Sequence, residues 1–288
     1  MSSYAKAKIG VIGGSGLYEM EGLKVLEEQW VETPFGRPSD QIVIGELEGE
    51  KLAFLPRHGK GHRFNPTEIN FRANIFAMKL LGVESILAVS AVGSMKEEIE
   101  PGHIVLVNQF IDRTRQRPST FFEKGIVAHV SFADPVCPRL FEAVYRGTKE
   151  TKATVHKGGT YVCIEGPMFS TRAESKVYRS WGVDVIGMTN YQEAKLAREA
   201  EICYTTIALS TDYDCWKEDE TVTGEQVMAT MKKNVATAKE IIRKSIPHVA
   251  GKRNCSCGEA LKGAIFTDPS RIETETKKRL APLVEKYL

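Results

Sequence analysis

The sequence predicts an α/β fold: a single domain with a mixed central β-sheet flanked by helices on both faces, and a C-terminal helical appendage. Apolar strand-like segments alternate along the chain with segments of helical periodicity. The later strand candidates are continuously apolar, as expected for strands covered on both faces. The 288 residues are 42% hydrophobic and 26% charged, which is typical of a globular protein with a sizeable core.

Eight apolar segments are the predicted strands, and most of them end in a glycine or a polar turn. Because they alternate with helices, a mixed or parallel sheet is expected. The predicted strands span residues 8–12, 41–47, 51–55, 85–89, 104–110, 159–164, 184–188 and 203–210.

Four short motifs predict helix starts, because each places a capping side chain or an acid where free N–H groups need acceptors. Gly82, Gly182 and Pro247 are predicted to end three of these helices. The four motifs are Asn65-Pro66-Thr67-Glu68, Thr171-Arg172-Ala173-Glu174, Asn190-Tyr191-Gln192-Glu193 and Thr223-Gly224-Glu225-Gln226.

The domain organisation follows from a change in composition near residue 250. Residues 1–250 show no internal repeat or low-complexity linker, so we expect one domain. The stretch 251–258 is polar and contains glycine, and residues 271–288 are charged with helical character. We therefore expect residues 251–288 to form a partly helical tail.

Charge and hydropathy narrow the choice of partners. The net charge of +2 argues against a broad nucleic-acid-binding surface. No apolar run approaches the roughly 20 residues of a membrane span. The N-terminus lacks the apolar core of a signal peptide. We expect a cytoplasmic protein that binds neither nucleic acid nor membrane.

The six cysteines give little indication of a metal site. Most lie in apolar runs and are interpreted as small buried side chains. Only Cys255-Ser256-Cys257 is patterned, and no second cysteine pair in the sequence completes a zinc motif. We expect no metal site, and either reduced, exposed thiols or a redox-labile link at this pair.

Polar turns after several predicted strands indicate a ligand site. Ligands of α/β proteins bind at the carboxyl ends of strands, and backbone N–H groups, hydroxyls and an arginine gathered there favour an anion such as phosphate. The turns are Gly13-Gly14-Ser15-Gly16, Pro56-Arg57-His58-Gly59, Ser90-Ala91-Val92-Gly93-Ser94 and Gly187-Met188-Thr189.

Each turn also has other interpretations. Gly14-Ser15-Gly16 invites a dinucleotide-binding or nucleophile-elbow motif, but Glu19 and Leu17 occupy the positions where those motifs need a glycine. A simple tight turn remains open there. Arg57-His58 is either an anion grip or a surface pair. The acids of Thr211-Asp212-Tyr213-Asp214 suit acid–base work, metal binding or an Asx turn.

Together, these segments resemble the trimeric purine nucleoside phosphorylase family, and within it the S-methyl-5'-thioadenosine phosphorylases. The resemblance runs from about Lys8 to Pro247, with every motif in its expected order. It also includes Gln109-Phe110-Ile111-Asp112-Arg113-Thr114, Glu165-Gly166-Pro167, Phe169-Ser170-Thr171-Arg172-Ala173-Glu174 and Thr211-Asp212-Tyr213-Asp214-Cys215-Trp216.

The resemblance implies a nucleoside phosphorylase-like fold and the phosphorolysis of S-methyl-5'-thioadenosine to adenine and 5-methylthioribose 1-phosphate, in methionine and purine salvage. It implies no cofactor, since inorganic phosphate is a co-substrate, and a homotrimer or homohexamer. The implied catalytic residues are Asp212 and Asp214. The implied phosphate ligands are Ser15, Arg57, His58, Ser90, Ala91 and Thr189. The implied nucleoside contacts are Phe169, Met188, Asp212, Asp214 and a neighbouring subunit's counterpart of His129. The implied specificity positions are Ser170 and Gly224.

Chemistry supports this interpretation and leaves rivals. An acid at position 212 complements the 6-amino group of adenine, whereas an amide would suit a 6-oxo purine better. A related phosphorylase acting on methylthioinosine, inosine or adenosine is the nearest alternative. A dinucleotide-dependent oxidoreductase and a non-catalytic nucleotide sensor are more distant ones.

The sequence departs from the family pattern in four places. Related enzymes often carry arginine at Met168 and a Val-Pro helix entry at 190–193, and Gly224 replaces a small branched residue. The tail after about Gly251 falls outside the resemblance.

Overall fold

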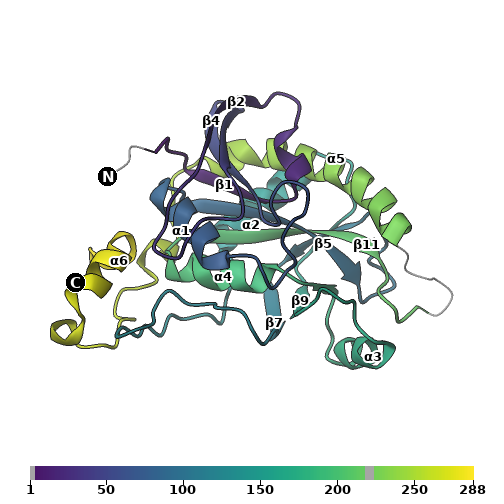
Figure 1. Cartoon of the computed structure of the whole chain (residues 1–288). Helices are drawn as coiled ribbons and strands as arrows, with labels where there is room; N and C mark the ends of the chain where they lie inside the picture. Colours follow the sequence, from purple (N-terminus) through teal and green to yellow (C-terminus); the bar gives the residue numbers. More distant parts are fainter. Residues whose placement is uncertain (1–3, 218–223) are drawn as a thin grey trace.

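Four parallel strands form the centre of the protein. The structure is a computed structural model that describes residues 4–217 and 224–288. β4 (Glu50–Pro56), β1 (Ile9–Gly13), β5 (Ser85–Ser94) and β11 (Cys203–Asp212) lie in that order (Figure 1). Gly13 is in register with Pro56, and Ile12 with Ala88. The carboxyl ends of these strands therefore meet at one edge of the sheet, where ligands of α/β proteins bind.

Seven further strands among the described residues extend this centre into a mixed sheet of eleven strands. β3 and β2 continue it beyond β4, while β6 and β8 continue it beyond β11. The far end of β5 instead pairs with β10, which leads to β9 and β7. The bounds are β2 (Lys24–Gln29), β3 (Ile42–Leu47), β6 (Ile104–Val107), β7 (Gln109–Arg113), β8 (Val155–Lys157), β9 (Thr160–Ile164) and β10 (Val185–Gly187).

Helices cover both faces of the sheet, as predicted (Figure 1). α1 (Phe71–Leu80) and α4 (Asn190–Glu199) bury residues such as Ile75 and Leu196 in one apolar cluster. α2 (Pro138–Thr148) and α5 (Gly224–Val249) bury Leu140 and Ile242 in another. α3 (Arg172–Ser180) lies apart, beyond β9. None of the described helices is long and apolar enough to cross a membrane.

Residues 251–288 contain η2 (Ser256–Glu259), η3 (Pro269–Arg271) and α6 (Thr274–Val284), and they pack on the sheet domain. Leu261, Leu280 and Leu283 belong to the same apolar cluster as α1 and α4. The carboxylate of Glu201 accepts hydrogen bonds from the Leu261 N–H and the Lys286 ammonium. This segment therefore shares the core of the preceding domain.

The predicted strands are present, with two differences. The predicted strand 104–110 is two strands separated at Asn108, because β6 pairs with β11 whereas β7 pairs with β9. β2 and β8 were not predicted. Nearly every residue of β2 is exposed. Because neither face of this strand is buried in the core, its sequence does not need the hydrophobic alternation by which a strand is predicted.

Helix starts were predicted less well than strands. The capping box at Thr171 is confirmed, with Thr171 and Glu174 each accepting the other's backbone N–H. The start predicted at Asn65 is wrong: Asn65–Glu68 forms a self-capped turn, and α1 begins at Phe71 with Asn70 as its cap. Asn190 is the first residue of α4 rather than its cap, a position that Thr189 occupies, and its amide donates to the Tyr204 hydroxyl.

Pro247 does not end α5, which continues to Val249. The fourth predicted start is only partly visible, because Thr223 lies outside the described residues while Gly224 is the first residue of α5.

The expectation of exposed thiols at the Cys-x-Cys pair is also wrong. Cys257 is 4% exposed, and Cys255 is partly buried. Both lie beside Cys137 and Cys203, which are far away in the sequence and provide the second pair that no sequence motif showed.

Candidate active site

A cavity of about 610 Å³ lies where the central strands end, and the predicted site residues gather in it. Its walls come from the ends of β4, β5, β10 and β11 and from the connection between β9 and α3. Of the residues proposed from the sequence, those lining it are Arg57, His58, Ser90, Ala91, Phe169, Ser170, Met188, Thr189, Asp212 and Asp214.

One end of the cavity offers hydroxyls and backbone groups. The Ser90 and Thr189 hydroxyl oxygens lie 3.4 Å apart, and both residues are buried. Two backbone segments also line this end: Gly14 in the turn after β1, and Ala91 within β5. Neutral donors gathered around one space form a typical oxyanion site.

Arg57 supplies positive charge at this end, but its guanidinium fork faces Glu193. Nε and Nη2 donate to the two Glu193 carboxylate oxygens at 2.7 and 3.0 Å. Nη1 donates to the Val89 carbonyl at 2.6 Å, and Nη2 also reaches the Ile12 carbonyl at 3.4 Å. Within the described part of the chain, these bonds occupy four of the five guanidinium N–H groups, which leaves one for an anion. Arg57 therefore cannot give phosphate the bidentate grip that its residue type suggested.

Glu193 was missed by sequence reasoning and is the centre of a buried network below the cavity. It is fully buried, and its carboxylate also accepts from the Tyr204 hydroxyl at 2.9 Å and the Asn190 amide at 3.3 Å. Burial raises the pKa of Tyr204 well above its ordinary value, with the Glu193 charge adding to the rise. Tyr204 therefore stays a hydroxyl donor, and the network fixes Arg57 in one position.

His58 is neutral at this end of the cavity. Burial lowers its pKa to about 4, and the charge of Arg57 adds to this effect, although the hydrogen bond to the Phe64 carbonyl opposes it. Nδ1 must donate in that 2.8 Å bond, since a carbonyl only accepts. Nε2 is then an acceptor, which suits the hydroxyl of a hydrogen phosphate.

Two acids and a hydroxyl occupy the other end. Asp212 accepts from the Thr211 hydroxyl at 2.7 Å and the Asp214 N–H at 2.8 Å. The Ser170 hydroxyl lies 3.3 Å from both Asp214 carboxylate oxygens. Burial raises the pKa of Asp212, and the charge of Asp214 also raises it, against the two hydrogen bonds. An acid that holds its proton more tightly is suited to sharing one with a ring nitrogen.

The backbone positions this acid through a β-bulge and a close contact. The register of β11 on β5 shifts between Ser210 and Asp212, and bulges of this kind redirect side chains beside active sites. A Cβ on Gly93 would lie 3.0 Å from both the Asp212 carboxylate and Ile186. Gly93 therefore leaves the room that Asp212 occupies.

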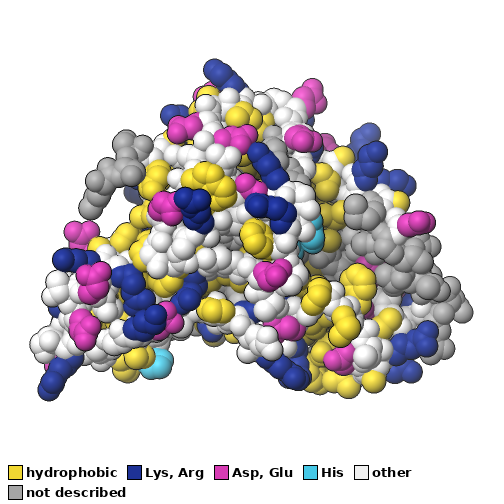
Figure 2. Space-filling model, viewed as in Figure 1, with side chains coloured by type: hydrophobic (Ala, Val, Ile, Leu, Met, Phe, Trp, Pro, Cys, Tyr) yellow, Lys and Arg dark blue, Asp and Glu magenta, His cyan; other side chains and the backbone are white. Residues whose placement is uncertain are grey.

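Phe169 stands at the cavity wall with much of its ring exposed. It is 66% exposed, and the neighbouring Met168, where we noted a departure from the family pattern, is 81% exposed. Figure 2 shows hydrophobic side chains over the α3 region, where Val177 and Trp181 are also exposed. An aromatic face at the wall of a cavity can stack on a flat ring.

Arg117 is a second residue that sequence reasoning missed. Its side chain is fully buried, and it donates to the backbone carbonyls of Met188 and Glu165, to the Gln192 side chain and to the Glu165 carboxylate. It therefore ties together two turns that border the cavity. Its sequence context, a polar Arg-Gln-Arg-Pro stretch, carries no strand or helix signal.

Three predicted site residues are not among those that line the cavity. Ser15 begins η1 (Ser15–Tyr18), next to the cavity residue Gly14, but its side chain lies outside the described part of the chain. Gly224 begins α5, and its surroundings are likewise not described. His129 is exposed elsewhere, with its ring edge-on to Phe266 at 4.9 Å. Their roles remain predictions.

Comparison with known proteins places the chain among phosphorylases. Residues 8–247 match the family model described as the phosphorylase superfamily. The S-methyl-5'-thioadenosine phosphorylase of Geobacter sulfurreducens is 60% identical, over 97% of this chain and 99% of its own. The protein of the same description from Koribacter versatilis is 55% identical, over 98% and 97%. Such coverage includes most of residues 251–288, so these relatives share the tail that we had placed outside the resemblance.

Solved structures agree in fold. A methylthioadenosine phosphorylase from an antarctic soil metagenomic library has a TM-score of 0.93 at 48% identity, covering 97% of this chain and 99% of its own. The methylthioadenosine phosphorylase of Schistosoma mansoni in complex with adenine has a TM-score of 0.84 at 36% identity, covering 93% and 99%.

Proposed function

The chain belongs to the phosphorylase superfamily, and we propose that it catalyses the phosphorolysis of S-methyl-5'-thioadenosine to adenine and 5-methylthio-α-D-ribose 1-phosphate, a step of methionine and purine salvage. The observation that supports this most strongly is the division of one cavity into an oxyanion end and an acidic end. The two ends match the charges that separate in the reaction.

The chemistry follows from those charges. A phosphate oxygen forms a bond to the anomeric carbon while the bond from that carbon to the purine N9 breaks. Positive charge develops on the ribose and negative charge on the purine, so phosphate at one end and a proton at the other stabilise the transition state. Asp212 shares its proton with N7 of the departing adenine.

We assign the phosphate to Ser15, Arg57, His58, Ser90, Ala91 and Thr189. Ser90 and Thr189 donate hydroxyls and Ala91 donates its N–H, while Arg57 contributes charge and one remaining N–H group. His58 accepts a hydrogen bond through Nε2 from the hydroxyl of the hydrogen phosphate, and its ring stays neutral. Phosphate is a co-substrate, and this reaction needs no cofactor.

We assign the nucleoside to Phe169, Met188, Asp212 and Asp214, with Ser170 holding Asp214 in place. Ser170 and Gly224 set specificity, and His129 reaches the nucleoside in a neighbouring subunit's cavity. The working form is therefore a homotrimer or a dimer of trimers, in the cytoplasm.

A related phosphorylase acting on methylthioinosine, inosine or adenosine is the alternative, and substrate comparison decides between them. We expect kcat/KM for S-methyl-5'-thioadenosine to exceed the values for all three competitors. The 6-oxo purines place an acceptor opposite a carboxylate, which costs affinity. A higher kcat/KM for methylthioinosine or inosine would contradict the assignment of Asp212.

A further inference from the structure

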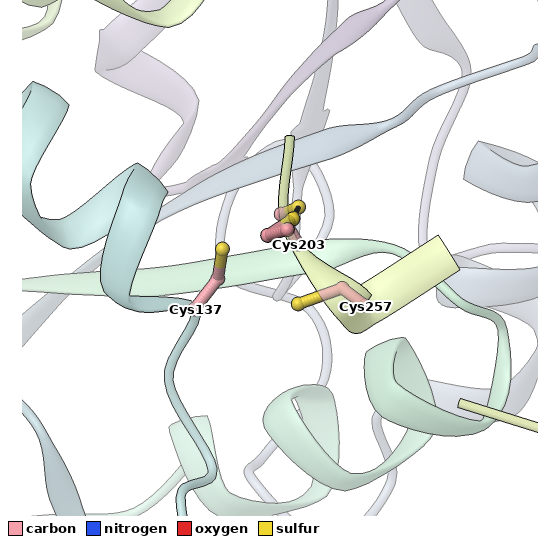
Figure 3. A group of neighbouring side chains, drawn as sticks. Cys137, Cys203 and Cys257 are labelled. Atoms are coloured by element: carbon pink, nitrogen blue, oxygen red, sulfur yellow. Dashed lines mark hydrogen bonds between the residues drawn. The ribbon is translucent and has the colours of Figure 1, made fainter. Parts of the chain in front are cut away.

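Four cysteine side chains converge at the opposite end of β11 from the cavity (Figure 3). Cys137 directly precedes α2, Cys203 begins β11, and Cys255 and Cys257 lie at η2. Their Sγ atoms all lie within 4.8 Å of one another. In Figure 3 the sulfur atoms of Cys137, Cys203 and Cys257 face a common space.

The spacing of the sulfur atoms fits a tetrahedral metal. Bonds of about 2.3 Å from zinc to four thiolates place neighbouring sulfur atoms about 3.8 Å apart. The Cys203 and Cys255 sulfur atoms are 3.3 Å apart, and no pair exceeds 4.8 Å. A disulfide would bring a pair to about 2.05 Å and would draw on two of the four residues only.

The backbone around the cluster is already fixed. The Cys137 N–H donates to the Tyr204 carbonyl, and the Cys203 N–H donates to the Glu84 carbonyl. Cys137, Cys203 and Cys257 are 1%, 0% and 4% exposed, so these three ligands would need little rearrangement. Cys255 is the partly exposed member, which leaves a route for the ion to enter.

Two arginines provide the charge that such a site needs. Four thiolates around a divalent ion carry a net charge of −2. Arg139 lies beside Cys203, and Arg253 lies beside Cys203 and Cys255. The Nε atoms of both arginines are buried without a hydrogen-bond partner among the described residues. Thiolate sulfurs would accept those N–H groups, as outer-shell donors do in metal sites.

We propose that Cys137, Cys203, Cys255 and Cys257 bind one structural Zn²⁺ ion and release their thiol protons to solvent as they do so. All four positions are filled by protein ligands, so no open position remains for chemistry. β11 is ten residues long, which separates the ion from Asp212 by roughly 30 Å. The ion joins η2 to α2 and β11, and it thereby fastens residues 251–288 to the sheet domain.

Metal analysis of the purified full-length protein tests this proposal. We expect about one zinc per chain after exhaustive dialysis, and none in Cys255→Ser/Cys257→Ser. Cys163→Ser is the matched control, since Cys163 is buried outside the cluster, and it should keep its zinc. Removing zinc with a chelator should lower the unfolding midpoint of the wild type and of the control by several degrees, and leave that of the double variant unchanged.

Two further measurements keep the proposal falsifiable if the double variant does not fold. Co²⁺ exchanged into the wild type should give the charge-transfer absorption of a tetrahedral thiolate site. Titration of thiols in denaturant with chelator and without reductant should find all six cysteines free. The proposal would be overturned if the purified protein held no zinc and also failed to take up Co²⁺. It would also be overturned if only four or two thiols were free and the remaining cysteines formed disulfides.

Discussion

Asp212 and Asp214 are two residues apart in sequence and differ in what holds them. Asp212 accepts from Thr211 and from the Asp214 backbone, whereas Asp214 is buried against the Ser170 hydroxyl. Burial raises the pKa of Asp212. We therefore assign proton sharing with the purine to Asp212, and orientation of the ring to Asp214 and Ser170.

Replacing the acid tests this assignment. Asp212→Asn should reduce turnover of methylthioadenosine on the order of 10²–10⁴-fold, because an amide cannot donate the proton. It should also improve the ratio for 6-oxo analogues, which accept the new N–H donor. Steady-state kinetics check both effects. Asp134→Asn, at an exposed position, should behave as wild type. Full activity in Asp212→Asn would mean that another group is the acid.

Arg57 and Glu193 can be separated by a double variant. Arg57→Ala should raise the phosphate KM and lower the free energy of unfolding by about 3–5 kcal/mol, because Glu193 is left buried without a countercharge. Arg57→Met/Glu193→Gln should recover much of that stability while the phosphate KM stays high. Denaturant unfolding and phosphate titrations measure the two effects. A phosphate KM that recovers together with the stability would limit Arg57 to a structural role.

Ten of the thirteen site residues that the family resemblance implied line the cavity, because strand ends converge in α/β folds whatever the details of packing. Glu193 and Arg117 were not predictable in this way. The ion-pair partner of each, Arg57 for Glu193 and Glu165 for Arg117, lies more than 45 residues away, and nothing local distinguishes the two residues from surface charges. The four-cysteine cluster was missed for the same reason, since a Cys-x-Cys pair indicates a site only once its distant partners are known.

At the scale of elements, strands were easier to predict than helix starts. Buried strands are apolar along their length, so β1, β4, β5 and β11 are visible in the sequence. Capping motifs also form isolated turns: Asn65–Glu68 satisfies its own N–H groups and contacts Glu165 through Thr67, but the helix begins later. An exposed edge strand such as β2 has no hydrophobic signal.

α4 carries a buried acid whose ionisation should make stability depend on pH. Glu199 is 3% exposed and accepts from the Thr120 hydroxyl and the Phe121 N–H. Burial raises its pKa to about 7, against those hydrogen bonds. The unfolded chain loses the Glu199 proton at a lower pH than the folded chain does. The stability that the protonated Glu199 contributes is therefore fully present below about pH 4.5 and is lost as the pH rises through 7.

Glu199→Gln should therefore be more stable than wild type at pH 8, on the order of 2–3 kcal/mol, and similar to it near pH 4.5. The amide can still accept from Phe121 and donate to Thr120. Thermal unfolding across this pH range checks the sign. Glu259→Gln, at an exposed site, should show no such dependence. A variant less stable at pH 8 would show that the carboxylate is favourable where it lies.

At the scale of the whole molecule, residues far from the cavity also matter: residues 251–288 support the surface that carries His129, which acts only in the proposed trimer. Residues 251–288 complete the core, and Phe266 from this segment contacts His129. The tail thus holds the surface from which we propose His129 reaches a neighbouring subunit.

Subunit mixing tests that role. His129→Ala should raise the nucleoside KM, and Asp212→Asn should be nearly inactive. If each site combines one subunit's Asp212 with a neighbour's His129, chains of the two variants refolded together should regain wild-type kinetics in roughly a quarter of the sites. The unmixed variants refolded alone are the controls. A mixture that only averages the two variants would place His129 outside the neighbouring site.

The most direct test of the central claim is adenine release from S-methyl-5'-thioadenosine, followed with and without inorganic phosphate. We predict release that depends on phosphate, with one 5-methylthioribose 1-phosphate formed for each adenine. Equal release without phosphate, yielding free 5-methylthioribose, would show a hydrolase and contradict the phosphate site. No release under either condition would contradict the proposed substrate.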